Sequence, residues 1–290
     1  MAITADMVKK LRDQTGAGMM DCKKALGETN GDFEKAVTLL REKGIAVAAK
    51  REARAASEGR VGSHISADAK AGALVELNCE TTFVAKTDEF VQLAKDLAQH
   101  VVESKTDCSN AIMDEAFRNG QTVGESISEI MGKVGEKLTL SRFARVATDG
   151  VIGSYIHMGD QIGVLVEMKG GGGNEEVLQI AKDIAMHVSW SNPEYLVRDE
   201  IPADAITKER EVHKAWAIKE GKPEKVIDRI VDGRMSEFYS RTVLMEQPFI
   251  KDEEQTIEKL IASASKSAGE PVSIVKFVRF RVGENAGDGE

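Results

Sequence analysis

Two kinds of hydrophobic periodicity meet in the segment Leu74-Val75-Glu76-Leu77-Asn78-Cys79-Glu80-Thr81-Thr82-Phe83-Val84-Ala85-Lys86. Its first residues alternate between apolar and polar side chains, which predicts a strand with one buried face. Residues 81–84 should then connect this strand to a helix, with Phe83 at the tip of the connection. The helix is predicted from Asp88 onward, where the apolar residues fall at helical spacing: Phe90, Leu93, Ala94, Leu97 and Val101.

The role of Phe83 is open at this point. Most large apolar residues are buried, so the base rate favours a side chain that packs into its own core. The alternative is a side chain that is displayed on the surface for a partner. The segment alone does not choose between the two.

Composition limits the classes of protein to which the chain can belong. At 290 residues it exceeds one typical domain, so two or three domains are expected. The net charge of −9 argues against a general binder of nucleic acid or anionic membranes, and no apolar run has the length of a transmembrane helix. Cys22, Cys79 and Cys108 form no C-x-x-C pair, which is typical of free thiols in a reducing compartment. We therefore expect a cytoplasmic protein without a membrane or nucleic-acid partner.

Residues 1–54 are predicted to form a small domain of three helices. The second helix starts near Met19, and a third runs from Asp32, its N-cap, to Gly44. Met19 and Met20 lie beside glycines. Adjacent methionines often fill cores, but their flexible thioethers also suit adaptable binding surfaces, and both roles stay open.

The rest of the chain contains an internal repeat, which predicts a duplicated α+β unit. Each copy reads strand, strand, helix, so each should form a small antiparallel sheet covered by helices. The predicted fold class is therefore multidomain α+β. Three segments recur in the same order: Gly62-Ser63-His64-Ile65 as Gly153-Ser154-Tyr155-Ile156, Leu74-Val75-Glu76-Leu77 as Leu165-Val166-Glu167-Met168, and Ala94-Lys95-Asp96-Leu97-Ala98-Gln99-His100-Val101 as Ala181-Lys182-Asp183-Ile184-Ala185-Met186-His187-Val188.

The predicted domain boundaries follow from this repeat. A linker at 55–60 leads to a first core half at 61–146 and a second half at 147–282. Two amphipathic helical patterns interrupt the second copy at about 192–250, which predicts an inserted helical hairpin or coiled coil. Residues 283–290 are predicted to form a flexible acidic tail.

The two copies differ at the connection that carries Phe83. The second copy has Lys169-Gly170-Gly171-Gly172-Gly173-Asn174 in its place, without an aromatic residue and without the Lys-Ser/Thr of a phosphate-binding P-loop. A side chain that the shared core required should be apolar in both copies. The comparison therefore favours display of Phe83.

Two segments are unusually specific. One is Thr81-Thr82-Phe83-Val84 after the strand, and the other, near the N-terminus, is Val8-Lys9-Lys10-Leu11-Arg12-Asp13-Gln14-Thr15-Gly16-Ala17-Gly18-Met19-Met20-Asp21-Cys22-Lys23-Lys24-Ala25-Leu26. Both resemble signatures of the bacterial elongation factor Ts family, which usually has Asp in place of Thr82. The resemblance extends to about residue 283. It implies an N-terminal module similar to ubiquitin-associated domains, a core in two α+β halves, and a helical hairpin inserted in the second half.

The resemblance also implies a function. Members of the family bind elongation factor Tu, both GDP-bound and nucleotide-free, and promote GDP release without a cofactor or metal of their own. It implies that Thr81, Thr82, Phe83 and Val84 disturb the magnesium and phosphate site of Tu, with Phe83 as a wedge. Threonine at position 82 keeps a hydroxyl but lacks the charge of the usual Asp. The further Tu contacts that it implies are Arg12, Met19, Met20, Val134, Gly135 and His157.

Enzymatic chemistry is not predicted. The chain has no G-x-S-x-G, H-E-x-x-H or Walker A motif, and no Cys/His set with metal spacing. Cys79 and the repeat-equivalent pair His100 and His187 are expected to pack rather than react. Two alternatives to an exchange factor stay open. One is a non-exchanging adaptor or dimerisation protein with a ubiquitin-associated-like module, and the other is an enzyme whose titratable groups cluster only in the fold.

Overall fold

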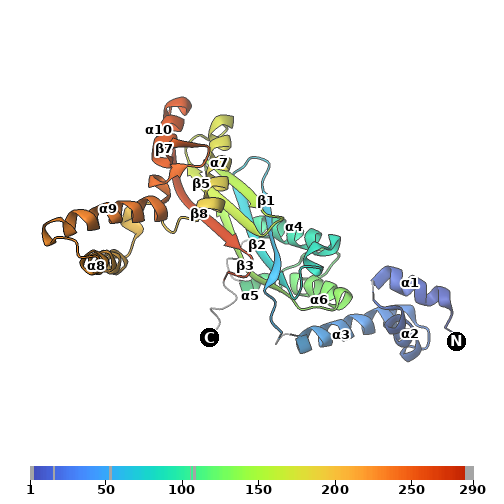
Figure 1. The fold of residues 1–290 in the computed structure, drawn as a ribbon. Coiled ribbons are helices and arrows are strands. Elements are labelled where there is room, and N and C mark those ends of the chain that lie inside the picture. Colours follow the sequence, from blue (N-terminus) through green and yellow to red (C-terminus); the bar gives the residue numbers. More distant parts are fainter. Residues whose placement is uncertain (1–2, 16, 52–53, 105, 107–108, 285–290) are drawn as a thin grey trace.

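Two three-stranded antiparallel sheets lie at the centre of the computed structural model, which describes residues 3–15, 17–51, 54–104, 106 and 109–284 (Figure 1). Helices pack on both sheets, so the predicted α+β class is confirmed. The first sheet has the order β1 (Glu58–Ile65), β2 (Ala71–Cys79), β3 (Leu138–Ala147). The second has the order β4 (Val151–His157), β5 (Ile162–Lys169), β8 (Ser273–Arg281).

Strand β2 is buried on both faces. Val75 and Leu77 belong to the apolar cluster beneath α4 (Asp88–Glu103), whereas Leu74 lies in a layer between the two sheets together with Leu165. All four side chains are fully buried. The prediction of one buried face was wrong, because the second sheet covers the face that would otherwise meet solvent.

The two halves repeat the same close contact between helix and strand. Helix α4 crosses β1 at Gly62, and α7 (Glu175–Ser191) crosses β4 at the equivalent Gly153. A Cβ atom at either position would lie 2.2 Å from a backbone atom of Ala94 or Ala181 in the helix above. Any larger residue would push the helix off the sheet, so both halves depend on glycine at this point.

A second helix in each half leads into the last strand of its sheet. In the first half α6 (Val123–Val134) ends at Gly135, and in the second half α10 (Ile257–Ala268) ends at Gly269. Both glycines adopt left-handed backbone conformations, with φ of 81° and 71°. The short helix α5 (Ser109–Ile112) precedes α6.

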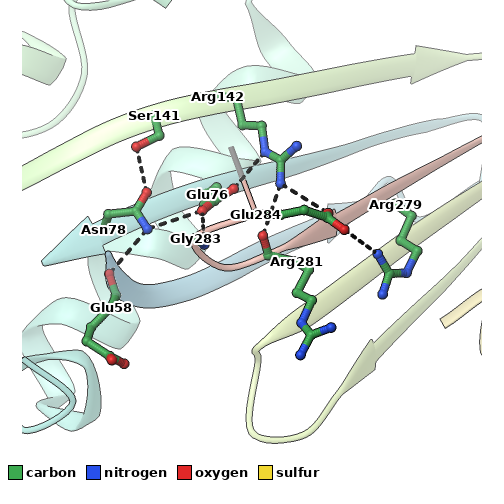
Figure 2. A network of polar contacts seen from close by, with 9 residues as sticks. All are labelled: Glu58, Glu76, Asn78, Ser141, Arg142, Arg279, Arg281, Gly283 and Glu284. Atoms are coloured by element: carbon green, nitrogen blue, oxygen red, sulfur yellow. Dashed lines mark hydrogen bonds and ion pairs between the residues drawn. The ribbon is translucent and has the colours of Figure 1, made fainter. Parts of the chain in front are cut away.

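A buried polar network ties the chain after β8 to the first sheet (Figure 2). The carboxylate of Glu76 accepts hydrogen bonds from Arg142 Nε at 2.6 Å, Asn78 Nδ2 at 3.1 Å and the backbone N–H of Gly283 at 2.8 Å. Glu284 adds an ion pair to Arg142 at 3.8 Å. Residues 283 and 284, which were predicted to begin a flexible tail, are therefore bound to the core.

The N-terminal helices α1 (Ala5–Thr15), α2 (Met19–Glu28) and α3 (Phe33–Arg51) surround an apolar cluster of their own. The side chain of Asp32 caps α3 by accepting a hydrogen bond from the backbone N–H of Lys35, as expected. The predicted end of this helix at Gly44 was wrong. A glycine costs a helix only about 1 kcal/mol, and the alanine-rich run that follows favours its continuation.

The insertion in the second half contains two helices that project away from the sheets (Figure 1). Helices α8 (Ala203–Lys219) and α9 (Glu224–Thr242) pack on each other through a small buried cluster. Short elements flank them: η2 (Arg198–Glu200), η3 (Leu244–Glu246), β6 (Pro248–Phe249) and β7 (Asp252–Thr256).

Three further predictions concern the linker, the cysteines and the C-terminal tail. Strand β1 begins at Glu58, inside the segment 55–60 that was predicted to be a linker. Cys22 and Cys79 are buried free thiols, whereas Cys108 lies outside the described residues. Residues 285–290 of the predicted tail also lie outside them.

Replacement of Glu76 with alanine should destabilise the protein by about 3 kcal/mol, because Arg142 then loses its closest anionic partner in a largely buried site. Glu167 is the matched control, since it holds the equivalent repeat position and forms a longer ion pair, 3.6 Å, with a half-exposed Lys276. Glu167→Ala should cost under about 1 kcal/mol. Urea denaturation measures both losses, and equal values would contradict a special role for Glu76.

A pH dependence should come from His187, which is buried. Its Nε2 bonds to Gln247 Oε1 at 2.8 Å, and its Nδ1 accepts from the backbone N–H of Ile250 at 3.2 Å. A neutral ring satisfies both contacts, and protonation at Nδ1 would break the second. Burial outweighs the opposing bond to Gln247 and lowers the pKa of His187 below its ordinary value of 6.5.

The unfolded chain therefore takes up this proton at a higher pH than the folded chain. The resulting stability should be complete above about pH 6.5 and should decline as the pH falls toward the folded-state pKa. Denaturation midpoints across this range measure the decline, and NMR titration of the imidazole measures the pKa directly. A His187 pKa at or above 6.5 would show that the ring is not held neutral.

Candidate functional site

The connection between β2 and α4, here called the Phe83 loop (residues 80–87), places one aromatic side chain in solvent. Within it η1 (Val84–Lys86) forms a single helical turn. Thr82 and Phe83 are exposed, Phe83 by 84% of its surface. Val84 and Ala85 are buried in the cluster beneath α4. The Phe83 side chain is therefore exposed to solvent and not packed in its own core, and Lys86 is exposed in the same loop.

Glu136 holds the beginning of the Phe83 loop. Its carboxylate accepts two hydrogen bonds from Thr81, one from the backbone N–H at 2.9 Å and one from the hydroxyl at 2.6 Å. In return, the carboxylate of Glu80 accepts a bond from the backbone N–H of Lys137 at 2.7 Å. The Thr81 carbonyl accepts from Cys79 Sγ at 3.2 Å. Every polar group of Thr81 is therefore engaged inside the protein.

Arg60 on β1 links the far end of the loop to the turn between β4 and β5. Its guanidinium donates to the carbonyl oxygen of Ala85 and pairs with the carboxylate of Asp160. The backbone N–H of Val61 also donates to the Asp160 carbonyl at 2.7 Å. This β4–β5 turn exposes Met158 by 68% of its surface, with a φ of 53° that is uncommon for a residue other than glycine. The Phe83 loop and the β4–β5 turn consequently lie side by side.

Three other residues singled out from the sequence lie near this loop. Val134 is the last residue of α6, and Gly135 follows it directly before Glu136. His157 is the last residue of β4, where its Nδ1 bonds to the Tyr155 hydroxyl at 3.0 Å. The fold therefore places Val134 and Gly135 directly before the residue that holds the Phe83 loop, and His157 at the start of the turn that contains Asp160.

The remaining singled-out residues belong to the N-terminal helices. Arg12 lies on α1 and pairs with the neighbouring Asp13 at 2.8 Å. Met19 and Met20 open α2, and they are 47% and 74% exposed. Both methionines are therefore exposed and do not fill the core of the N-terminal helices.

The N-terminal helices contact the core through α6. An ion pair of 2.6 Å joins Arg41 on α3 to Glu125 on α6. Beside it lies a groove of about 660 Å³ between the N-terminal helices and α6 with the segment that precedes it. Residues of both groups line this groove, among them Ala17, Gly18, Val37, Leu40, Gly132 and Lys133.

The groups around the Phe83 loop are suited to contact with a partner. Burial, followed by the charge of Glu136, raises the pKa of the Cys79 thiol to about 12, so the thiol stays protonated and is not a nucleophile. Among the described residues, no group of three or more His, Cys, Asp or Glu side chains could hold a metal ion. In the same part of the chain, no helix is long and apolar enough to cross a membrane.

In the second half, a carboxylate also holds the loop that corresponds to the Phe83 loop. The backbone N–H of Gly171 donates to Glu270 Oε1 at 2.8 Å. Glu270 follows Gly269 at the end of α10, as Glu136 follows Gly135 at the end of α6. A carboxylate after the last helix thus holds the loop in both halves.

The roles of Glu136 and Arg60 were not predicted from the sequence. A signal existed for Glu136, because the dipeptide Gly-Glu recurs before the last strand of each half. No sequence signal pointed to the role of Arg60, since its partner Asp160 lies 100 positions away in the chain.

Comparisons with known proteins give one consistent result. A protein-family model described as elongation factor TS matches residues 80–284. The elongation factor Ts of Clostridium botulinum (strain Eklund 17B) is 44% identical over 283 residues, which are 97% of this chain and 93% of that protein. Those of Clostridium perfringens (strain SM101) and Clostridium kluyveri (strain ATCC 8527) are 44% and 45% identical, with the same coverage. These matches span nearly the whole chain, and the protein therefore belongs to the elongation factor Ts family.

Proposed function

We propose that this translation elongation factor binds elongation factor Tu in its GDP-bound form and promotes release of the nucleotide, with Phe83 as the inserted group. The observation that carries the proposal is an aromatic side chain, 84% exposed, on a loop held at both ends by Glu136 and Arg60. Phe83 stabilises no core of its own. An aromatic side chain that enters a pocket of a partner is a typical anchor of a protein interface.

Exchange of this kind needs binding energy and no covalent chemistry. Phe83 inserts near the magnesium and phosphate site of Tu and separates groups that hold GDP. By linkage, a factor that weakens GDP binding must itself bind GDP-loaded Tu less tightly than empty Tu, by the same ratio. The protein acts as an exchange factor and not as an enzyme, and it requires no cofactor.

The four residues at the centre of this proposal divide into two pairs. Thr82 and Phe83 are exposed and contact Tu directly. Thr81 and Val84 face inward and keep the loop in shape. Around them Val134, Gly135 and His157 add contacts from the same surface.

A second contact region lies on the N-terminal helices, which we take as a ubiquitin-associated-like module over residues 1–54. Met19 and Met20 supply its exposed apolar surface, and Arg12 adds a charge. The core halves at 61–146 and 147–282 hold the Phe83 loop, and α8 and α9 form a coiled-coil hairpin that reaches other parts of Tu.

Removal of the aromatic ring tests the proposal. Phe83→Ala should lower the rate of GDP release from Tu at saturating factor by about tenfold or more, because a central aromatic anchor is worth about 2 kcal/mol. The free protein should lose less than about 1 kcal/mol of stability, because the ring is exposed. Release of fluorescent GDP and urea denaturation measure the two quantities.

Trp190 provides a matched control, since it is also a large aromatic residue and is 74% exposed. Trp190→Ala should leave both the release rate and the stability unchanged. A Phe83→Ala protein that exchanges normally would exclude the wedge. A wild-type protein that binds Tu without releasing GDP would favour a non-exchanging adaptor.

The residue before the aromatic ring gives a separate test. Thr82→Asp restores the residue usual in the family, and it should keep or raise the rate of GDP release. Thr82 is exposed, so the stability change should stay within about ±0.5 kcal/mol. The assay compares release rates over a range of magnesium concentrations. A large loss of activity in a folded Thr82→Asp protein would mean that this loop is adapted to threonine.

A further inference from the structure

We propose that Glu136 is the positioning residue of the exchange site, and that it acts through Thr81 to hold Phe83 ready for insertion. This inference rests on the proposed function and deepens it. It assigns no contact between Glu136 and Tu. Its subject is the shape of the loop before Tu arrives.

The contacts of Thr81 explain how one carboxylate can set the direction of the loop. Glu136 takes both the backbone N–H and the hydroxyl of Thr81, at 2.9 and 2.6 Å. Two bonds to the two oxygens of one carboxylate fix the orientation of a residue and not only its distance. Phe83 follows two positions later, before the buried Val84 and Ala85.

The second half of the protein serves as an internal comparison. There Glu270 takes one loop N–H, that of Gly171, at 2.8 Å, and the glycine has no hydroxyl to offer. A bond from one loop N–H to this carboxylate therefore occurs in both halves, although Gly171 lies three residues after Met168 and Thr81 lies four residues after the equivalent Leu77. The hydroxyl bond is an addition in the half that displays an aromatic ring, which connects it with the use of Phe83.

The physical benefit is preorganisation. An exposed ring cannot fix its own loop, because it packs against no core. A loop that samples several shapes weakens apparent binding in proportion to the fraction of time spent in the competent shape. Once Tu is bound, the loop is ordered both in the wild-type protein and in a variant that lacks the carboxylate. Loss of the carboxylate should thus raise the factor concentration needed for half-maximal exchange and leave the maximal rate nearly unchanged.

The experiment measures GDP release from Tu against the concentration of full-length factor. For Glu136→Ala we expect a rise of roughly tenfold in the half-saturating concentration, as for a loop that is competent about a tenth of the time. Thr81→Val, which keeps the backbone bond and loses the hydroxyl bond, should show a smaller rise. Thr81→Ser should restore wild-type behaviour.

Glu270→Ala is the matched control, because it removes the equivalent carboxylate from the half without an aromatic loop. It should change stability as Glu136→Ala does and leave the half-saturating concentration at the wild-type value. The double variant Glu136→Ala/Thr81→Val should be no worse than Glu136→Ala alone, because the two residues act through one contact. Additive effects would mean that Thr81 contacts Tu by itself, and would overturn the inference.

Hydrogen exchange of the free factor provides a readout that does not need Tu. Glu136→Ala should speed exchange of the amides at 81–85, whereas Glu270→Ala should not. Unchanged exchange there would overturn the inference, and so would faster exchange with an unchanged half-saturating concentration. If Phe83→Ala abolishes GDP release but Glu136→Ala matches Glu270→Ala, the proposed function stands and the positioning role fails. If the wild-type factor releases no GDP, both fail.

Discussion

An apolar layer between the two sheets holds the two halves of the protein together. A small sheet is stable only when its apolar faces are covered, and helices cover only one face of each sheet here. Leu74 of the first sheet and Leu165 of the second fill the layer between the other two faces. Ser63 and Ser154, which are equivalent in the repeat, meet within it at 3.0 Å between their hydroxyl oxygens. Each half thus completes the core of the other through matching residues.

This layer also determines where the functional surface can form. The Phe83 loop belongs to the first half, but Arg60 joins it to Asp160 in a turn of the second half. The two meet only because the sheets are stacked. Rigidity of the loop is therefore a property of the whole core, and the exposed ring relies on contacts from both copies.

Each half of the duplicated core has a feature that the other half lacks. The first half displays the Phe83 ring, whereas the equivalent connection in the second half is a glycine loop. The second half carries the hairpin of α8 and α9 between its first helix and α10. A common scaffold that requires Gly62 and Gly153 for the same helix contact has thus been given different surfaces. The differences lie in loops and insertions, where changes disturb the packed layers least.

The periodicity of the amino-acid sequence was enough to predict the local structure and the repeat. The change from alternating to helical spacing around residue 83 predicted the strand, the loop and the helix, because these periods report directly on backbone geometry. The missing aromatic residue in the second copy favoured an exposed Phe83, and the side chain is exposed. The resemblance of the motifs to the elongation factor Ts family agreed with the later comparisons.

The pairing of distant polar groups, in contrast, depends on how the elements stack in three dimensions. Glu76 looked like the solvent side of a strand, yet it is 3% exposed, because the second sheet and Gly283 cover it. Glu136 lies 55 positions from Thr81, and Arg60 lies 100 positions from Asp160. Periodicity describes neighbours along one element. It carries no information on which distant carboxylate a loop will reach, because that depends on how the sheets and helices stack.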